Sequence, residues 1–244
     1  MGQRDHATRF EKWATSGKEG QPPVLAATVI LLRDNEGALE TLMLRRNSKI
    51  VFGGMWVFPG GRLDPQDWEG VAEGDDLAAS RRAAEREALE ECGLRVESEA
   101  MVPFSHWTPP AITPKRFLTW FFAARAGEGD VAIDHGEIHE SDWMPPAEAL
   151  RRQGLQQIEL APPTYVTLSE LAAFSSVDHA LDVVGRRQPE RFQTVIGVTD
   201  AGPVTMWHGD AGYDAADPFL PGPRHRLTMV KGGPWTYDRS GGSS

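Results

Sequence analysis

Alternating apolar and polar segments divide the first two thirds of the chain into predicted strands. Val24 to Leu32 is a continuous apolar and β-branched run, which is typical of a buried strand. The turn-forming sequence Asp34-Asn35-Glu36-Gly37 follows, and Leu39 to Arg45 is the predicted return strand. Four further strands are predicted, at Met55 to Phe58, Leu94 to Pro103, Phe117 to Ala124 and Ile138 to Met144.

One long helix is predicted from Leu77 to Cys92, after a polar loop rich in glycine and proline. Asp75 or Asp76 can cap its start, and Gly93 suits the left-handed position that ends many helices. Small and apolar residues recur on one side of this helix, so we expect that side to pack on a sheet.

The pattern changes beyond residue 160, where helices precede strands. After a short helix predicted at Pro145 to Arg152, this part has predicted helices at Thr164 to Phe174 and Val177 to Arg186. A hairpin is predicted at Phe192 to Val198 and Val204 to Trp207, and a further strand at Arg224 to Val230. We therefore expect an α/β fold with a C-terminal helical and β-hairpin extension. The expected organisation is a flexible segment (1–21), a main domain (22–160), an extension packed on it (161–239) and a flexible tail (240–244).

Charge and composition narrow the class of partner. Of the 244 residues 40 % are apolar, which is enough for a folded core. Lys and Arg number 25 against 35 Asp and Glu, so the net charge of −10 disfavours nucleic acid and membrane surfaces, which are polyanions. A single cysteine, Cys92, and no apolar run typical of a signal peptide or membrane span favour the cytoplasm.

The strongest chemical signal is a group of glutamates near the end of the long helix. Glu87, Glu90 and Glu91 are three and four positions apart, so they share one side of the helix. Their mutual repulsion costs a few tenths of a kcal/mol per pair. Divalent cations such as Mg²⁺, which prefer carboxylate oxygens and share them with phosphates, would remove that cost. The alternative, a solvated charged face, is disfavoured by the preceding Pro59-Gly60-Gly61, where glycine allows close backbone approach.

Together these residues resemble a known motif. Gly61 and the run from Arg86 to Leu94 are similar to the Nudix box, Gly-x5-Glu-x7-Arg-Glu-U-x-Glu-Glu-x-Gly-U with U apolar, and the second half matches at every fixed position. The resemblance implies an α/β/α Nudix sandwich around a mixed sheet. It also implies that Glu87, Glu90, Glu91 and Gly61 bind Mg²⁺ or Mn²⁺, that Glu90 and Arg86 belong to the catalytic set, and that Arg86 orients the carboxylates.

The first half of the box departs from the pattern. Gly61 and Arg86 are 25 positions apart, whereas the motif has 14, so the loop carries an insertion of about 11 residues. The box's first glutamate, the usual partner of the arginine, would fall on Ala78. Glu73, Asp75 and Asp76 are the candidates to replace it.

Other residues extend the likeness to the coenzyme A diphosphatase branch, some members of which carry a long insertion in the box. Asp64, Pro65 and Asp67 are similar to the start of the box in those relatives. The cations Arg45, Arg46, Arg62, Lys115 and Arg116 are candidates to bind substrate phosphates.

The position of an additional acid is open between two residues. Glu137 stands six residues before Trp143, a spacing at which many Nudix enzymes place a base or an extra metal ligand, and Glu140 is the competing choice. Trp107 and Phe117 could stack on a base, although core packing is the better interpretation for a single aromatic residue.

The predicted function is Mg²⁺-dependent hydrolysis of a small-molecule diphosphate by attack of water at phosphorus, with coenzyme A or an acyl derivative as the first candidate substrate. ADP-ribose, dinucleotides or nucleotide sugars are the first alternative. A Nudix-fold module that binds nucleotides without turnover is the second. For the C-terminal extension, three roles stay open: it could cover the substrate, pair two chains into a homodimer, or complete the core.

Overall fold

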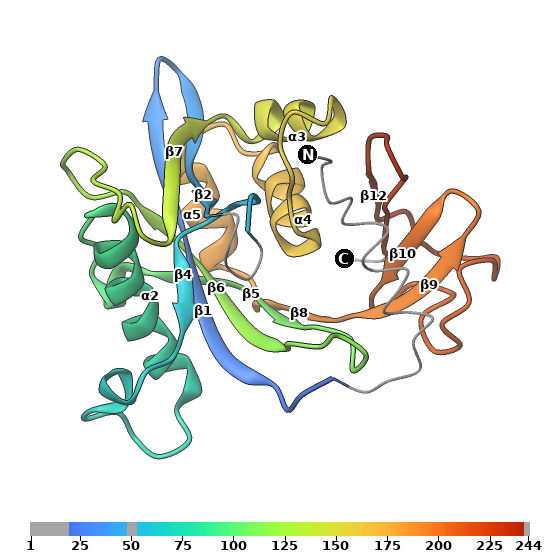
Figure 1. Ribbon diagram of the computed structural model, residues 1–244, viewed down its shortest axis with the longest axis horizontal. Coiled ribbons are helices and arrows are strands. Elements are labelled where there is room, and N and C mark those ends of the chain that lie inside the picture. Colours follow the sequence, from blue (N-terminus) through green and yellow to red (C-terminus); the bar gives the residue numbers. More distant parts are fainter. Residues whose placement is uncertain (1–19, 48–52, 242–244) are drawn as a thin grey trace.

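A mixed sheet of eight strands forms the centre of the protein, in a computed structural model that describes residues 20–47 and 53–241 (Figure 1). Its strands are β1 (Val24–Asn35), β2 (Ala38–Arg46), β3 (Trp56–Val57), β4 (Gly60–Arg62), β5 (Val102–Thr108), β6 (Phe117–Arg125), β7 (Ile138–Met144) and β8 (Glu190–Gln193). The order is β3-β2-β1-β6-β5-β8, with β4 paired to β1 and β7 to β2. β1 runs parallel to β6 and β5 parallel to β8, whereas the other pairs are antiparallel.

Helices cover both faces of this sheet, which confirms the expected α/β sandwich (Figure 1). The helices are α2 (Asp76–Cys92), α3 (Pro146–Gly154), α4 (Pro162–Leu171) and α5 (Val177–Gly185), with short 3₁₀ turns η1 (Pro65–Trp68) and η2 (Ser98–Ala100). α2 packs on one face, and α3, α4 and α5 lie on the other. Two apolar cores result, one on each side of the sheet.

The sequence explains why α2 lies so close to the sheet. Asp75 caps it by accepting a hydrogen bond from the Ala78 amide, and Gly93 ends it at a φ of 72°. The buried side of the helix is made of small residues, including Ala84 and Ala88. Because these side chains are short, the helix backbone can approach β1 and β4 closely, which brings the helix glutamates to the edge of the sheet.

Two strand predictions were wrong. The segment predicted as a strand from Leu94 to Pro103 begins with irregular chain and the turn η2, and β5 starts only at Val102. The strand predicted from Phe192 to Val198 is interrupted at Thr194, because β8 joins the main sheet while β9 (Val195–Thr199) starts a second sheet.

The second sheet turns the predicted hairpin into a four-stranded antiparallel unit. Its other strands are β10 (Gly202–Met206), β11 (Arg226–Thr228) and β12 (Thr236–Asp238), in the order β12-β11-β10-β9. Aromatic rings join it to the core: Trp107 of β5 stacks on Phe192 of β8 with ring centroids 3.9 Å apart, and Trp207 packs edge-on against both. The extension therefore completes the core of the main sheet.

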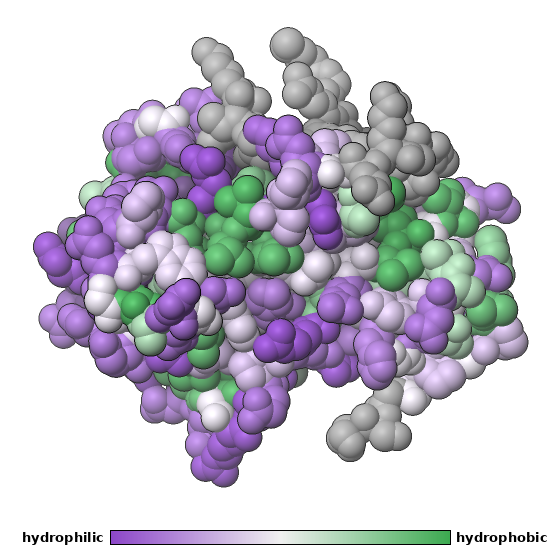
Figure 2. All heavy atoms as spheres, turned by 90° about the horizontal axis from the view of Figure 1, so that it is seen from below, coloured by the Kyte–Doolittle hydropathy of each residue, from purple (hydrophilic) through white to green (hydrophobic). Residues whose placement is uncertain are grey.

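Some expectations fall outside the described part of the chain. The flexible segment predicted for residues 1–21 lies mostly beyond it, as do the last three residues of the predicted tail. Within the described ranges, no helix has the length and apolar character needed to cross a membrane. Seen from below, hydrophilic residues cover most of the periphery, while hydrophobic side chains come to the surface near the middle (Figure 2).

A buried ion pair organises the loop between β10 and β11. The Arg226 guanidinium donates from Nε and Nη2 to both carboxylate oxygens of Asp210, at 2.7 and 2.6 Å. The Asp210 carboxylate also accepts hydrogen bonds from the backbone N–H groups of Gly212 and His225, and the Arg226 Nη1 donates to the Pro218 carbonyl. Burial opposes ionisation here, but these donors hold the pKa of the Asp210 carboxyl below its ordinary value.

Replacing Arg226 by Met should lower the free energy of unfolding by about 3–5 kcal/mol, because Asp210 would be left as a buried charge without its counter-ion. Urea denaturation at pH 7 measures this loss. Arg224→Met is the matched control, since the half-buried Arg224 side chain donates to a backbone carbonyl, that of Leu220, and its cost should stay within about 0.5 kcal/mol.

Acidification should reduce the difference in stability between the two proteins. In the wild type the pKa of Asp210 is lowered, so its stabilising effect is present above about pH 4 and is lost as the pH falls below that value. In Arg226→Met the unpaired Asp210 carboxyl would take up a proton, so the free energy of unfolding should rise as the pH falls from 7 to 5. Equal stability of the two variants at every pH would contradict this role of the pair.

Candidate active site

A large pocket of about 800 Å³ lies where β1, β4 and β6 meet the end of α2. Thr28, Thr119 and Phe121 form part of its floor. The extension contributes to its walls through the start of α4, including Pro162, and through Thr205 of β10. The predicted glutamates and most of the predicted cations line the same pocket, so the fold brings together residues that are far apart in the sequence.

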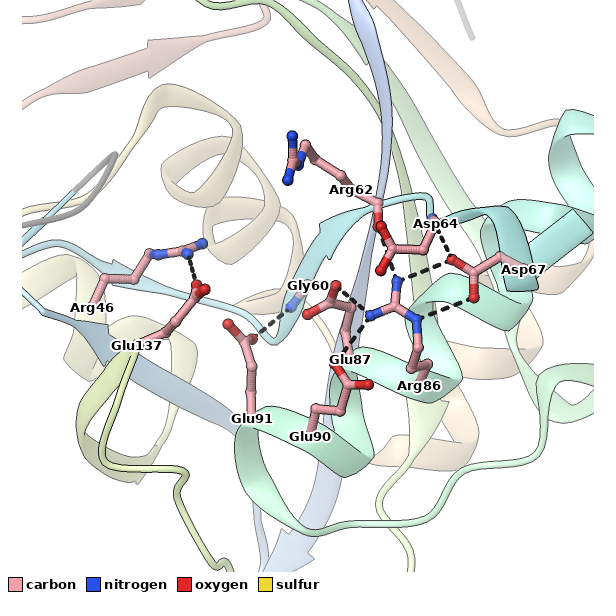
Figure 3. A network of polar contacts seen from close by, with 10 residues as sticks. All are labelled: Arg46, Gly60, Arg62, Asp64, Asp67, Arg86, Glu87, Glu90, Glu91 and Glu137. Carbon is pink, nitrogen blue, oxygen red and sulfur yellow. Dashed lines mark hydrogen bonds and ion pairs between the residues drawn. The ribbon is translucent and has the colours of Figure 1, made fainter.

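The double glycine of β4 lies directly against the helix glutamates (Figure 3). The Gly60 amide donates to the Glu91 carboxylate at 2.9 Å, and Glu91 is only 5 % exposed. A Cβ atom on Gly61 would lie 2.3 Å from Oε1 of Glu87, so any other residue here would force that carboxylate to move. Glu90, one turn away from Glu87, has a side chain that is 57 % exposed at the pocket wall.

Burial changes the acidity of two of these groups. Desolvation, reinforced by the negative charges of Glu87 and Glu137, raises the pKa of the Glu91 carboxyl to about 8, although the Gly60 amide and Arg46 oppose the shift. Burial also raises the pKa of the Glu87 carboxyl, against the lowering effect of Arg86. The protein therefore holds a pair of neighbouring carboxyl groups in a place that disfavours their ionised form unless a cation is close.

Arg86 connects the glutamates to a buried acid in the inserted loop (Figure 3). Its Nε and Nη2 donate to the two carboxylate oxygens of Asp67 at 3.1 and 3.0 Å, and its Nη1 donates to Glu87 and Glu90. Nη2 also donates to the Arg62 carbonyl. Burial works against its charge, but these acidic partners raise the pKa of the Arg86 guanidinium. Arg86 therefore holds the helix glutamates in place.

The predicted replacements for the first box glutamate were wrong. Asp75 caps α2, Asp76 is the first residue of that helix, and neither they nor Glu73 bond to Arg86 in the described residues. The partner is Asp67, 3 % exposed in the turn η1, where its carboxylate also accepts a hydrogen bond from the Asp64 amide. The capping pattern at Asp64-Pro65 was the available sequence signal for this position.

The donor set suits a hard divalent cation. Glu87, Glu90 and Glu91 offer carboxylate oxygens on one side of the pocket, and the closely fitted Gly61 keeps space beside Glu87. In the described residues no three acidic, histidine or cysteine side chains are gathered at metal-binding distance. Glu87 and Glu90 accept hydrogen bonds from Arg86, and Glu91 accepts one from the Gly60 amide.

Comparison with known proteins places the chain in a family. The family model for the NUDIX domain matches residues 22–163, which is more than half of the chain. The protein belongs to the Nudix family. The match ends at the first residues of α4, so most of the extension lies outside the family's common domain.

Two relatives illustrate the similarity. The chain is 29 % identical to acyl-coenzyme A diphosphatase NUDT19 of Xenopus laevis over 136 residues, which are 52 % of this chain and 36 % of that protein. The chain thus spans about a third of the length of this curated relative. A NUDIX hydrolase from Alicyclobacillus acidocaldarius has the same fold, with a TM-score of 0.61 and 23 % identity over 69 % of this chain and 99 % of that one.

The Nudix pocket contains Glu137 and does not contain Glu140. Glu137 pairs with Arg46 at 2.6 Å, and both line the pocket. Glu140 pairs with Arg45 on the outside of the sheet, where both side chains are about half exposed. Neighbouring residues of a strand point to opposite faces, so Arg45 and Arg46 cannot both serve the same pocket. Arg45, predicted to bind substrate, lies outside it.

The loop that carries Glu137 is held in a fixed shape. Asp134 accepts hydrogen bonds from the backbone N–H groups of Glu137 and Ile138, both at 2.9 Å, and the Asn47 amide donates to the Glu137 carbonyl. These bonds direct the Glu137 side chain toward the glutamates of α2 (Figure 3).

The remaining predicted residues separate into two groups. The pocket is also lined by Arg62, Lys115 and Arg116. These cations lie near the first residues of β1. Trp107 also lines it but is 4 % exposed and stacked on Phe192, so core packing is confirmed as its main role. Its ring offers no open face for a base.

Replacing Gly61 by Ala should weaken Mn²⁺ binding at least tenfold, because the new methyl group would displace the Glu87 carboxylate. Isothermal titration with Mn²⁺ measures the affinity. Gly185→Ala is the control, since its Cβ would have its nearest neighbour at 3.8 Å. An unchanged affinity in Gly61→Ala would remove Glu87 from the proposed metal set.

A second pair of variants tests the partner of Arg86. Asp67→Asn should release Arg86 and lower the free energy of unfolding by about 3 kcal/mol, because one side of a largely buried ion pair loses its charge. Asp75→Asn keeps a good capping residue and should change stability by less than about 0.5 kcal/mol. Urea denaturation of both proteins gives the two values, and a larger loss in Asp75→Asn would reverse the assignment.

Proposed function

We propose that this Nudix protein is a divalent-metal-dependent diphosphatase that hydrolyses a nucleoside diphosphate-linked small molecule, with coenzyme A or acyl-coenzyme A as the first candidate substrate. The observation that carries the proposal is the buried carboxylate of Glu91 beside Glu87, in a pocket that also contains cationic side chains. A protein that only packed this helix on its sheet would gain nothing from two neighbouring carboxyl groups whose ionised forms burial disfavours.

Each residue of the pocket has a role in this proposal. Glu87, Glu90 and Glu91 would hold Mg²⁺ or Mn²⁺, and a cation bound there neutralises phosphate charge and lowers the pKa of water. Arg86 keeps two of these carboxylates in position through its hydrogen bonds. The Glu137 carboxylate accepts the proton of the attacking water, and Arg46 orients that carboxylate.

The reaction balances as a hydrolysis. The oxygen of water forms a bond to one phosphorus atom of the diphosphate while the bond from that phosphorus to the bridging oxygen breaks. The proton released by water passes to Glu137, and the bridging oxygen leaves with the second phosphate. The products are two phosphate monoesters.

Support for coenzyme A comes from sequence similarity. The relative from Xenopus laevis is named as an acyl-coenzyme A diphosphatase, and the similarity covers about half of this chain. Acyl-coenzyme A combines a diphosphate with a long arm that ends in an apolar acyl chain, and the pocket offers apolar walls from the sheet and the extension next to its charged end. ADP-ribose, dinucleotides and nucleotide sugars are the alternative substrates within the same reaction class.

The decisive experiment is a hydrolysis panel with products identified by mass. We expect coenzyme A to give phosphopantetheine and adenosine 3′,5′-bisphosphate in the presence of Mg²⁺ or Mn²⁺, and chelation to stop the reaction. Glu90→Gln should reduce kcat at least a hundredfold with little change in stability, because it removes a charge from an exposed ligand. Glu85→Gln, on the same helix and outside the pocket, should keep wild-type activity.

Two results would overturn the proposal. Turnover in Glu90→Gln equal to that of the wild type would falsify the metal assignment. Binding of coenzyme A and ADP-ribose at millimolar Mg²⁺ without release of any product would instead make the protein a non-catalytic nucleotide-binding module.

A further inference from the structure

Three cations in the pocket have no partner in the parts of the chain that the structure describes. Arg62, Lys115 and Arg116 all line the pocket, and none of their side chains takes part in an ion pair or a hydrogen bond there. The other two pocket arginines differ, because Arg46 is paired with Glu137 and Arg86 with Asp67. The unpaired cations therefore form a group of their own.

Strand register brings these cations to one end of the pocket. Arg62 of β4 is paired with Ala26 of β1, which is also paired with Thr119 of β6. Arg116 is the residue before β6, and its carbonyl accepts a hydrogen bond from the amide of Val24 at the start of β1. Both elements place their cations near the first residues of β1.

The orientation of Arg62 separates this group from the glutamates. Its carbonyl oxygen faces Arg86, but its side chain extends away from Glu90 and Glu91 (Figure 3). The guanidinium is therefore directed toward the part of the pocket that the metal-binding carboxylates do not occupy.

A group of unpaired cations is unusual in a protein whose net charge is this negative. The protein has ten more acidic than basic residues, so most cations could find a carboxylate nearby. Arg116 is partly buried, and its Nε has no hydrogen-bond partner in the described residues. Leaving such a donor unsatisfied costs stability, which a bound anion would recover.

We propose that Arg62, Lys115 and Arg116 form a second anion subsite, which binds a phosphate monoester that the substrate carries apart from its diphosphate. This inference rests on the proposed diphosphatase function for its choice of substrate. A phosphate monoester fits the group because it has close to two negative charges and three acceptor oxygens, which match two guanidinium forks and an ammonium group.

The subsite distinguishes between the candidate substrates. Coenzyme A has a phosphate on the 3′-oxygen of its ribose, whereas dephospho-coenzyme A and ADP-ribose lack it. The two phosphates of the bridge are left to the cation that the helix glutamates would hold and to Arg46. The subsite therefore selects coenzyme A compounds over nucleotides whose only phosphates are in the bridge.

The test measures preference for the extra phosphate in two ways. Binding of adenosine 3′,5′-bisphosphate and of AMP is measured by titration calorimetry with chelator present, and kcat/KM is measured for coenzyme A and dephospho-coenzyme A. We expect the wild type to prefer the 3′-phosphorylated member of each pair about 10- to 100-fold, the range of one or two charge-assisted hydrogen bonds.

Single variants then assign the preference to residues. Lys115→Gln and Arg62→Gln change exposed side chains and should each reduce both ratios at least fivefold, while affinity for AMP stays within twofold. Arg45→Gln is the matched control, because it also removes one exposed positive charge but lies outside the pocket and pairs with Glu140. Its ratios should equal those of the wild type.

The outcomes separate this inference from the proposed function. Wild-type ratios near one, or variants that weaken both members of a pair equally, would overturn the subsite even if coenzyme A is hydrolysed. A preserved binding preference that the variants abolish, together with no hydrolysis of any compound, would support the subsite and overturn the diphosphatase assignment.

Discussion

The close contact between α2 and the glycines of β4 is the constraint on which the candidate site depends. Alanines on the buried side of α2 allow its backbone to approach the sheet, and the missing side chains of Gly60 and Gly61 provide the remaining space. The Gly60 amide then supplies a hydrogen bond to Glu91, a carboxylate that the same packing removes from water. Burial and repulsion raise the free energy of the glutamates when ionised, which is the physical basis of the proposed cation binding.

Arg86 limits how far that repulsion can distort the site. It bonds to Glu87 and Glu90 on one side and to Asp67 on the other, so the inserted loop is attached to the helix it precedes. A long insertion would normally be free to vary. Here Asp67 in the turn η1 of the insertion is the buried counter-ion of Arg86. It takes the place of the first glutamate of the Nudix box, from a different position along the chain.

Local sequence was sufficient for the long helix and most strands, and insufficient for two strands and several pairings. The capping residue Asp75, the helix end at Gly93 and the shared side of the three glutamates follow from helical spacing alone. The partner of Arg86 does not, because Asp67 reaches it only through the tertiary path of the inserted loop. Strand alternation alone separates Arg45 from Arg46, but it does not show which of the two enters the pocket, and the pairing of β2 with β7 shifts register between them. Trp107 lies in a stack with Phe192, a contact across strands more than eighty residues apart.

The extension links stability to the pocket. Its strand β8 continues the main sheet beside β5, and the rings of Phe192 and Trp207 pack on Trp107, whose side chain reaches the pocket. The start of α4 and Thr205 of the second sheet form walls of the same pocket. The family match ends at residue 163, so Pro162 lies within it, whereas Thr205 is a wall residue from outside the common Nudix domain. A change at Thr205 can alter the shape of the cavity without altering the glutamates of α2. The second sheet must therefore stay folded for the cavity to keep its shape.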